Sequence, residues 1–463
     1  MRSSFSDFWG NLPLPGSNKN TERRLLICLS FVSLGLLVIV FVHMQQDVAY
    51  WELMENALRA EREARTSWQN HAEVVRAESA KAMSRTTEGS ASNKGITLAS
   101  STLLQVPHPP EEAPKFKVYV YELPAEYNHA LKKDQPRCIN DQYGTEIRIH
   151  ETLLESPYRT QNPAEAEFFF VPIYGECYLF RANKNLGKGG LEDTNKWYHR
   201  AMKTIIHDHP YWNRTQGRDH VFVFAGARGP HIFKDWKRII KKSIFLTPEG
   251  DRSLSEQFNT WKDIVIPGLE NTKKLWSGEL RKQNFERTVF ASFRGTIHNR
   301  EGKSYSRGLR IVMEQNLRGQ KDVIFTSQSA RCDRNCYFED MRKSLFCLCP
   351  RGWSPWTLRA YQGMMVGCIP VVIADEIEFP YENTIDWTQL SVKIAEKDVN
   401  RTMEILRGIP EEQIRRKQDA IAKVWKTVTY PVPSEAGDAF HMIMEELGRK
   451  RRAFKASTFT SWT

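Results

Sequence analysis

The sequence lacks the short motifs that most often mark a phosphate or metal site. Neither a Walker-type GxxxxGK[ST] stretch nor a GxGxxG occurs in the 463 residues, which excludes the two commonest glycine-rich phosphate loops. Among the eight cysteines, Cys332 and Cys336 form a CxxxC pair, but no second Cys/His pair stands at zinc-finger distance. A zinc site is therefore not expected. No internal repeat is present, so a repeat architecture is not expected either.

Basic residues are in excess, but they are not concentrated. The formal net charge of +11 and the pI near 9.1 would suit a nucleic-acid partner. Lysine and arginine are nevertheless dispersed along the chain, and the two local clusters, at 237–242 and 449–452, are typical of solvated helix faces. Contact with an anionic donor or a polysaccharide is the alternative for these clusters. Nucleic acid is not expected as a partner.

Long hydrophobic runs are also scarce, and only one has the length of a membrane span. Residues 25–42 (LLICLSFVSLGLLVIVFV) are uncharged and long enough to cross a bilayer. Basic residues precede the run and acidic residues follow it, which predicts a cytosolic tail at 1–24 and a lumenal body. The His-Met-Gln-Gln that follows is unlike a cleavage site, so an uncleaved signal anchor is favoured over a cleaved signal peptide.

A stem is expected at 43–114. Residues 46–84 are rich in Ala, Glu and Arg without Gly or Pro, which favours a long exposed helix, and the rest is a Ser/Thr/Gly/Pro linker. In a lumenal body, Asn213 and Asn400 are candidate glycosylation sites, because each begins an Asn-x-Thr triplet. Cys332 with Cys336, and Cys138 with Cys177, are candidate disulfide pairs.

Apolar runs alternate with helical patterns from residue 116 onward, which predicts parallel α/β sheets. We expect two domains, at 115–285 and 286–455, followed by a tail at 456–463. The last helix is expected to return to the first domain. Expected strands lie at 116–121, 166–172, 220–224, 243–246, 263–267, 288–295, 322–326, 345–348 and 367–373; expected helical segments lie at 147–154, 306–315, 337–343, 357–366, 396–425 and 436–452.

The stretch 347–376 (CLCPRGWSPWTLRAYQGMMVGCIPVVIADE) reads as strand, loop, helix and strand. In parallel sheets, the loop that joins a strand's carboxyl end to a helix N-terminus is where phosphates bind. Arg351 and Arg359 offer planar cations, Ser354 and Thr357 offer hydroxyls, and Gly352 lets backbone N–H groups approach a ligand. An ordinary buried βαβ unit with surface arginines is the alternative.

The exact order of residues adds a resemblance. A Ser-x4-Arg-x7-Gly-Cys-Ile-Pro-Val pattern preceded by Cys-Pro-Arg-Gly resembles the nucleotide-sugar-binding region of the exostosin-like glycosyltransferases (family 47), and the whole run looks most like the plant and algal xylan-synthesising branch. The resemblance implies a GT-B fold, with two Rossmann-like domains facing a cleft, and a Golgi type II membrane protein. It implies a UDP-sugar donor. Our candidates for binding the donor are Arg294, Arg351, Gly352, Ser354, Thr357, Arg359, Gln362 and Gly367.

Gln362 departs from the family pattern. An acidic residue usually stands at this position, where it is expected to bind the ribose hydroxyls. An amide oxygen can accept the same hydrogen bond but lacks the charge that strengthens it. Gln362 therefore supports an alternative in which the chain is a non-catalytic scaffold subunit of a polysaccharide synthase complex.

The chain contains no Asp-x-Asp, the motif by which GT-A enzymes hold a divalent metal, so neither a metal nor a cofactor is implied. An inverting transfer needs a base on the first domain, across the cleft from the donor. Glu176, just past a buried strand, is the favoured candidate. Asp141, His150, Asp219 and His220 are the alternatives.

We therefore expect a Golgi enzyme that transfers a sugar from a UDP-sugar to a growing cell-wall polysaccharide, with inversion. β-1,4-xylosyl transfer to xylan is favoured, while glucuronic acid, galactose and arabinose donors stay open. The expected partners are the donor, a polysaccharide or oligosaccharide acceptor, the Golgi membrane and other glycosyltransferases in a complex. Trp353, Trp356 and Tyr361 are candidates for stacking on sugar rings.

Overall fold

The computed structural model describes residues 114–133, 137–253, 258–270, 286–298, 302–327 and 334–456. The expected tail at 1–24, the anchor at 25–42, nearly all of the stem and the tail at 456–463 fall outside these ranges or at their edge. A search of the described helices for a membrane-spanning segment finds none with sufficient length and apolar character.

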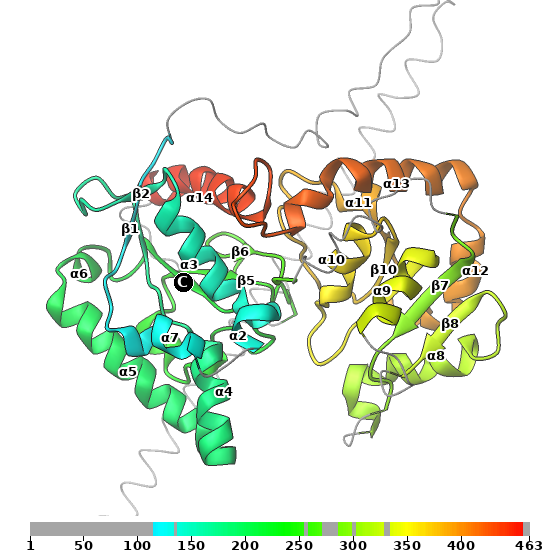
Figure 1. Ribbon diagram of the computed structural model, residues 1–463, viewed down its shortest axis with the longest axis horizontal. Helices are drawn as coiled ribbons and strands as arrows, with labels where there is room; N and C mark the ends of the chain where they lie inside the picture. The colour runs from blue at the N-terminus through cyan, green and yellow to red at the C-terminus, as the bar shows by residue number, and fades with distance from the viewer. Residues whose placement is uncertain are drawn as a thin grey trace, which may run out of the picture. The chain divides into compact units, whose positions relative to one another are not determined.

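The first domain is built on a six-stranded sheet in which every pair of neighbouring strands is parallel, in the order β2-β1-β3-β4-β5-β6. Its central strands are apolar and buried on both faces, as in Phe168–Phe170, so helices must cover both sides. The expected parallel sheet is confirmed (Figure 1). The strands are β1 (Val118–Val120), β2 (Arg159–Thr160), β3 (Phe168–Phe170), β4 (His220–Val223), β5 (Ile244–Thr247) and β6 (Ile264–Val265).

The second domain is built on a five-stranded parallel sheet in the order β11-β10-β9-β7-β8. β9 and β10 are its most deeply buried strands, and the helix of the stretch 347–376 connects one to the other along the chain. The strand–loop–helix–strand unit expected there is therefore confirmed. The strands are β7 (Val289–Arg294), β8 (Val323–Thr326), β9 (Ser344–Pro350), β10 (Ile369–Ile373) and β11 (Val392–Lys393).

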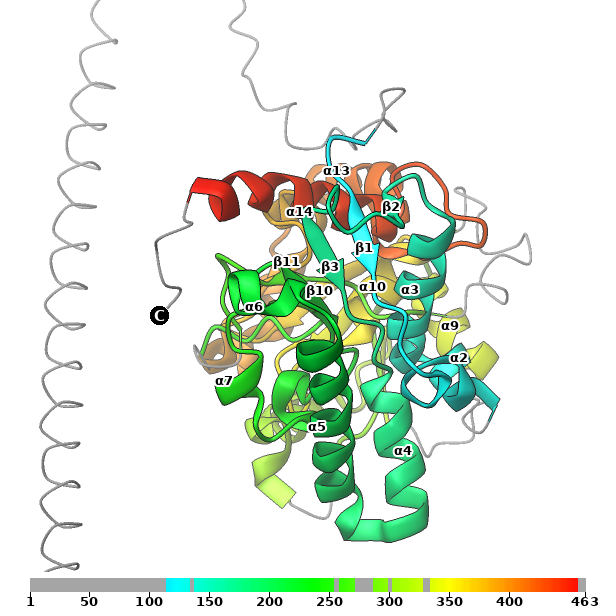
Figure 2. The same ribbon diagram turned by 90° about the vertical axis from the view of Figure 1, so that its left-hand side faces the viewer.

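Two long helices of the first domain were not predicted from the sequence. α4 (Gly175–Leu186) and α5 (Gly190–Asp208) pack side by side (Figure 2). Trp197 and Tyr198 of α5 lie in an aromatic core with Phe233. The remaining helices here are α2 (Arg137–Asn140), α3 (Thr145–Glu155), α6 (Tyr211–Thr215) and α7 (Trp236–Ile239), with 3-10 helices η2 (Ala125–Tyr127), η3 (His129–Lys133), η4 (Gln142–Gly144), η5 (Gly187–Gly189) and η6 (Gly229–Ile232).

The last helix, α14 (Ala439–Ala456), returns to the first domain, as expected. Arg451 pairs with Glu167 and Lys450 donates to the Thr260 carbonyl, which places α14 against the first sheet (Figure 1). The other helices of the second half are α8 (Leu309–Leu317), α9 (Arg334–Lys343), α10 (Leu358–Met365), α11 (Trp387–Leu390), α12 (Thr402–Arg407) and α13 (Glu411–Val424), with η7 (Gly302–Gly308), η8 (Glu396–Arg401) and η9 (Trp425–Val428).

A disulfide joins Cys347 of β9 to Cys368 at the start of β10. The candidate pair Cys138–Cys177 is wrong, because both are free buried thiols that lie against each other. Cys336 is disulfide-bonded, and Cys332, its expected partner, lies outside the described residues.

Candidate active site

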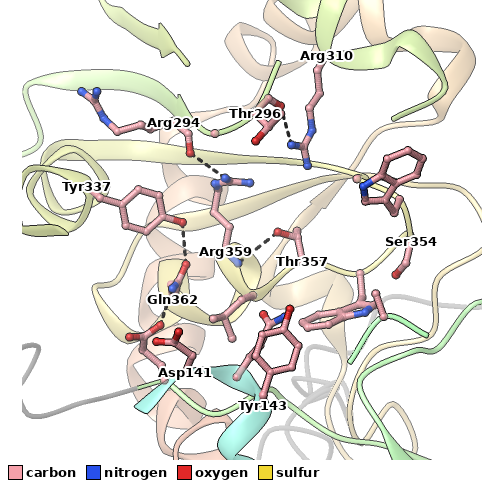
Figure 3. A pocket seen from close by; sticks show the side chains of 18 of the residues that line it. Asp141, Tyr143, Arg294, Thr296, Arg310, Tyr337, Ser354, Thr357, Arg359 and Gln362 are labelled. Atoms are coloured by element: carbon pink, nitrogen blue, oxygen red, sulfur yellow. Dashed lines mark hydrogen bonds between the residues drawn. The ribbon is translucent and has the colours of Figure 1, made fainter. Parts of the chain in front are cut away.

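A cavity of about 770 Å³ lies where the two domains meet. The first domain contributes the segment around η4, the loop after β4 and the end of the segment after β6, while the second contributes the loops after β7 and β9 and the start of α10. Figure 3 shows these side chains converging from both sides. The lining residues are Asp141, Gln142, Tyr143, Ala227, Glu270, Arg294, Gly295, Thr296, Tyr305, Arg310, Tyr337, Phe338, Gly352, Trp353, Ser354, Trp356, Thr357, Leu358, Arg359 and Gln362.

The N-terminus of α10 opens into this cavity. Thr357 is its N-cap, and the Thr357 hydroxyl accepts a hydrogen bond from the Arg359 backbone N–H at 3.4 Å. The other orphan N–H groups of the first turn and the helix dipole favour an anion at this end. The cavity therefore contains the helix N-terminus for which the sequence predicts phosphate binding.

Arg359 supplies unused hydrogen-bond donors beside this helix end. Its side chain is only 8% exposed and lies over the Phe293 ring, 4.5 Å from the ring centroid. Nη2 donates to the Arg294 carbonyl at 2.8 Å, while Nε and Nη1 make no hydrogen bond of good geometry to any described residue, although the Tyr337 hydroxyl lies near the guanidinium. Gly295 makes this approach feasible, since a Cβ there would lie 2.7 Å from Nη2. Buried N–H groups are normally paired, so two unpaired ones in a cavity point to an anionic ligand.

Two further arginines line the cavity but are already engaged. Arg294 donates through Nε and Nη2 to Asp340, at 2.8 and 2.6 Å. Arg310 donates to the carbonyls of Thr296, Pro350 and Arg351, and so ties the loop after β7 to the loop after β9. Burial and the neighbouring Arg359 lower the pKa of Arg310 to about 10. Arg310 was not singled out from the sequence, because its role depends on two loops that are distant along the chain.

Gln362 bridges the two domains. Its Oε1 accepts from the Tyr337 hydroxyl at 2.7 Å, and its Nε2 donates to Glu270 of the first domain at 2.6 Å (Figure 3). A carboxylate is therefore present in the cavity wall, but it comes from the opposite domain. The sequence analysis did not select Glu270 as a site residue. The one feature that could have indicated it is its position in the segment that follows the strand β6.

Two of the expected donor-binding residues do not reach the cavity. Arg351 is buried, and its Nη1 donates to Glu396 at 3.1 Å. Gly367 lies at the opposite end of α10, with φ of +71°, where its N–H donates to the Met364 carbonyl and ends the helix. The other six, Arg294, Gly352, Ser354, Thr357, Arg359 and Gln362, all line the cavity.

Of the three aromatic residues expected to stack on sugar rings, two line the cavity and one does not. Trp353 is 55% exposed at the cavity wall and meets Tyr305 edge-on, so its ring is accessible to a sugar. Trp356 lines the cavity, with its Nε1 unpaired among the described residues. Tyr361 is buried in the core and cannot stack on a ligand, which corrects that expectation.

Of the alternative bases, only Asp141 lines the cavity. Asp219 and His220 lie at the amino end of β4, where the Asp219 carboxylate contacts His220 Nδ1 and the Tyr121 hydroxyl contacts His220 Nε2. The cavity instead faces the carboxyl end of this strand, at Ala227. His150 contacts the Tyr174 hydroxyl at 2.8 Å, and burial lowers its pKa to about 4.

Glu176 does not line the cavity. It begins α4, is 4% exposed, and packs so closely on Gly226 that a Cβ there would lie 2.0 Å from its Oε1. Glu146 caps the same helix by accepting from the N–H groups of Gly175 and Glu176, at 2.7 and 2.9 Å. Burial raises the pKa of Glu176 to about 7, and Arg228 opposes the rise only in part.

The raised pKa of Glu176 predicts a stability that falls with pH. Near pH 4.5 the unfolded chain begins to lose this proton, whereas the folded chain keeps it until about pH 7, so stability is lost across that window. We expect a loss on the order of 3 kcal/mol from this group. In thermal unfolding scans from pH 5 to 8, Glu176→Gln should flatten the decline in midpoint. The matched variant Glu411→Gln, at an exposed carboxylate on α13, should leave the slope unchanged; equal slopes for wild type and Glu176→Gln would contradict the prediction.

Within the described residues, no group of three or more His, Cys, Asp or Glu side chains is arranged to hold a metal ion. What the cavity does contain is a helix N-terminus, unpaired arginine donors and a carboxylate, at the carboxyl ends of parallel strands. This is the arrangement of α/β proteins that bind anionic nucleotides.

The comparisons with known proteins identify the family. The Exostosin GT47 domain matches residues 112–409, and the chain belongs to this family of glycosyltransferases. It is 34% identical over 348 residues to the probable beta-1,4-xylosyltransferase IRX10 of Arabidopsis thaliana, covering 73% of this chain and 82% of that one. It is 35% identical over 349 residues to the probable glucuronosyltransferase GUT1 of Oryza sativa subsp. japonica, covering 73% and 81%. Among solved structures, spinosyn rhamnosyltransferase SpnG with thymidine diphosphate matches at 9% identity, with a TM-score of 0.30, covering 71% of this chain and all of that one.

Proposed function

We propose that the protein transfers a sugar from a UDP-sugar to a cell-wall polysaccharide, with β-1,4-xylosyl transfer to xylan as the favoured reaction. The observation that carries the proposal is the pair of unpaired Arg359 donors beside the N-terminus of α10. Both are suited to the charge that develops on a diphosphate as it leaves. The relatives include both a xylosyltransferase and a glucuronosyltransferase, and the resemblance of residues 347–376 to the xylan-synthesising branch favours xylose as the donor sugar.

In this proposal the cavity holds donor and acceptor side by side. The diphosphate lies against α10, Arg359 and the backbone at Gly352, and the nucleoside extends towards Gln362 and Tyr337. The accessible ring of Trp353 offers a stacking surface for a sugar of the acceptor. Transfer with inversion joins the acceptor oxygen to the donor's anomeric carbon as the carbon–oxygen bond to UDP breaks. We propose a two-domain GT-B arrangement for this chemistry and no metal.

We further propose that the enzyme is a type II Golgi membrane protein that works beside other glycosyltransferases. The apolar run 25–42 and the charges around it support this topology. Asn213 and Asn400 are both exposed, as lumenal glycosylation would require.

A scaffold without catalytic activity is the second candidate. It is favoured by the amide of Gln362, whose Oε1 and Nε2 are both engaged within the protein, by Tyr337 and Glu270. If the protein is a scaffold, its cavity would bind no donor.

One experiment separates these candidates. The full-length protein, purified in detergent, is incubated with a panel of UDP-sugars and xylo-oligosaccharides, and the products are weighed by mass spectrometry. We expect the mass of one pentose to be added from UDP-xylose. Addition of another sugar would change the donor assignment, whereas no addition together with no UDP binding by isothermal titration would favour the scaffold.

A further inference from the structure

Two carboxylates of the first domain line the cavity. Asp141 and Glu270 are the only Asp, Glu or His side chains among the described residues that do so. The other first-domain residues in the wall, Gln142, Tyr143 and Ala227, carry an amide, a phenol and a methyl group, none of which readily takes up a proton near neutral pH. The described part of the first domain therefore offers a bound ligand two possible proton acceptors, Asp141 and Glu270.

Glu270 is tied to α10 and holds the cavity wall together. It is 3% exposed, and its Oε2 accepts a hydrogen bond from Gln362 Nε2 at 2.6 Å. The Tyr337 hydroxyl holds the other end of the same amide at 2.7 Å. Uptake of a proton by Glu270 would weaken the bond that joins the two domains, because a charged acceptor makes the stronger hydrogen bond. Asp141 is therefore the better candidate for a group that receives a proton in each catalytic cycle.

The turn that carries Asp141 is fixed by contacts with the segment that carries Glu270. Asp141 is half-buried, and its carbonyl accepts a hydrogen bond from the Gly144 N–H at 2.8 Å. Thr145 Oγ1 accepts from the N–H of Leu269, the residue before Glu270, at 2.8 Å. The Asp141 side chain makes no capping hydrogen bond to η4, so its replacement removes no helix cap. These contacts do not involve the Asp141 carboxylate, and they should hold residue 141 at the cavity wall in variants too.

The position of Asp141 suits attack from the side opposite the diphosphate. In a transfer with inversion, the acceptor approaches the anomeric carbon opposite the leaving group, and the proton acceptor stands on that side. The diphosphate is assigned to α10, Arg359 and Gly352, which all belong to the second domain. Asp141 belongs to the first domain, on the side of the cavity that faces Thr357 and Arg359 (Figure 3). A sugar held between the two domains would present its anomeric carbon to an acceptor hydroxyl beside Asp141.

We propose that Asp141 is the base that accepts the proton of the attacking acceptor hydroxyl. The proposal rests on the transferase function proposed above and names a catalytic residue for that reaction. As the acceptor oxygen bonds to the anomeric carbon of the donor, the carbon–oxygen bond to the diphosphate breaks and its electron pair leaves with UDP. The hydroxyl proton moves to a carboxylate oxygen of Asp141, so atoms and charge balance.

The test compares Asp141→Asn with Glu270→Gln and with the control Asp208→Asn. In full-length protein, Asp141→Asn should lower kcat at least about 100-fold, the lower end of what a general base contributes. The Kd for UDP, from isothermal titration, should stay within about threefold of wild type, because α10 and Arg359 are unchanged. Glu270→Gln should instead raise the Kd for UDP more than it lowers kcat, because it loosens Gln362. Asp208, exposed at the end of α5 and outside the cavity, should tolerate the change to Asn with kcat within about twofold of wild type.

Chemical rescue distinguishes a base from a residue that only shapes the wall. Asp141→Ala removes the carboxylate and leaves a gap, into which formate can enter and accept the proton in its place. Transfer by Asp141→Ala should therefore rise at least about tenfold in sodium formate over sodium chloride of equal ionic strength. Asp208→Ala should show no such response. If Asp141→Asn does not fold, the formate response of Asp141→Ala decides alone.

Several results would overturn the assignment while the transferase function stands. One is turnover by Asp141→Asn within about tenfold of wild type, and another is an equal loss of UDP binding, which would place Asp141 at the donor. A third is the absence of rescue by formate in an Asp141→Ala protein that still binds UDP. A fourth is a large loss of kcat with intact UDP binding in Glu270→Gln. If the wild-type protein transfers no sugar from any UDP-sugar, the proposed function fails and this inference fails with it.

Discussion

Arg359→Lys is expected to weaken UDP binding by about 30- to 150-fold and to reduce transfer by at least as much. The guanidinium lies over Phe293 and uses Nη2 on the Arg294 carbonyl, which leaves Nε and Nη1 as two separate donors on different edges of the group. A lysine keeps the charge but cannot hold donors at both of these positions in one plane. Loss of one or two charge-assisted hydrogen bonds costs about 2–3 kcal/mol, which gives the stated range.

Isothermal titration with UDP and with UMP measures this effect directly. Because the missing contacts are to the diphosphate, the loss should be larger for UDP than for UMP. Arg318→Lys is the matched control, since the Arg318 side chain is 78% exposed at the C-terminal end of α8, where it pairs with Glu314. Undiminished UDP binding by a folded Arg359→Lys protein would remove Arg359 from the donor site.

Gln362→Glu is expected to weaken UDP binding about tenfold at pH 7.5. Gln362 Nε2 lies 2.6 Å from Glu270, so the substitution would place two carboxyl groups in contact in a poorly hydrated wall. Two carboxylates at this distance cannot both ionise without repulsion, and the pair must bind a proton or separate. The weakening should therefore be smaller at pH 5.5, where one carboxyl is protonated.

The double variant Gln362→Glu/Glu270→Gln restores one amide and one carboxyl, with their positions exchanged. It should recover most of the lost affinity, with a coupling free energy of at least about 1 kcal/mol in a double-mutant cycle. Gln320→Glu, at a partly exposed position outside the cavity, serves as the control for added charge. Tighter UDP binding by the single variant Gln362→Glu would show instead that an acid is preferred at residue 362 and that Glu270 does not oppose it.

The expected site and the observed site differ for physical reasons that particular residues illustrate. Arg351 and Arg359 have the same side chain, and both belong to the same short stretch. Arg351 is neutralised by Glu396, which is 45 residues further along the chain, whereas Arg359 meets an aromatic ring and one carbonyl. No local pattern distinguishes them, because the pairing of a side chain depends on what folds against it.

The candidates for the catalytic base also show that local sequence does not reveal which side chains reach the cavity. Glu176 follows a buried strand, a common position for a catalytic carboxylate, yet it packs against Gly226 and does not line the cavity.

Alternating apolar runs and helical patterns were enough to predict two parallel sheets and the strand–loop–helix–strand unit at 347–376, because strand burial and helix periodicity are local properties. The family, too, could be read from that run. Which side chains are free to act was decided by contacts between segments far apart in the chain: Glu270 with Gln362, and Arg310 with two separate loops. Hydrogen bonding and desolvation act through space, so these roles come into being only when the two domains meet.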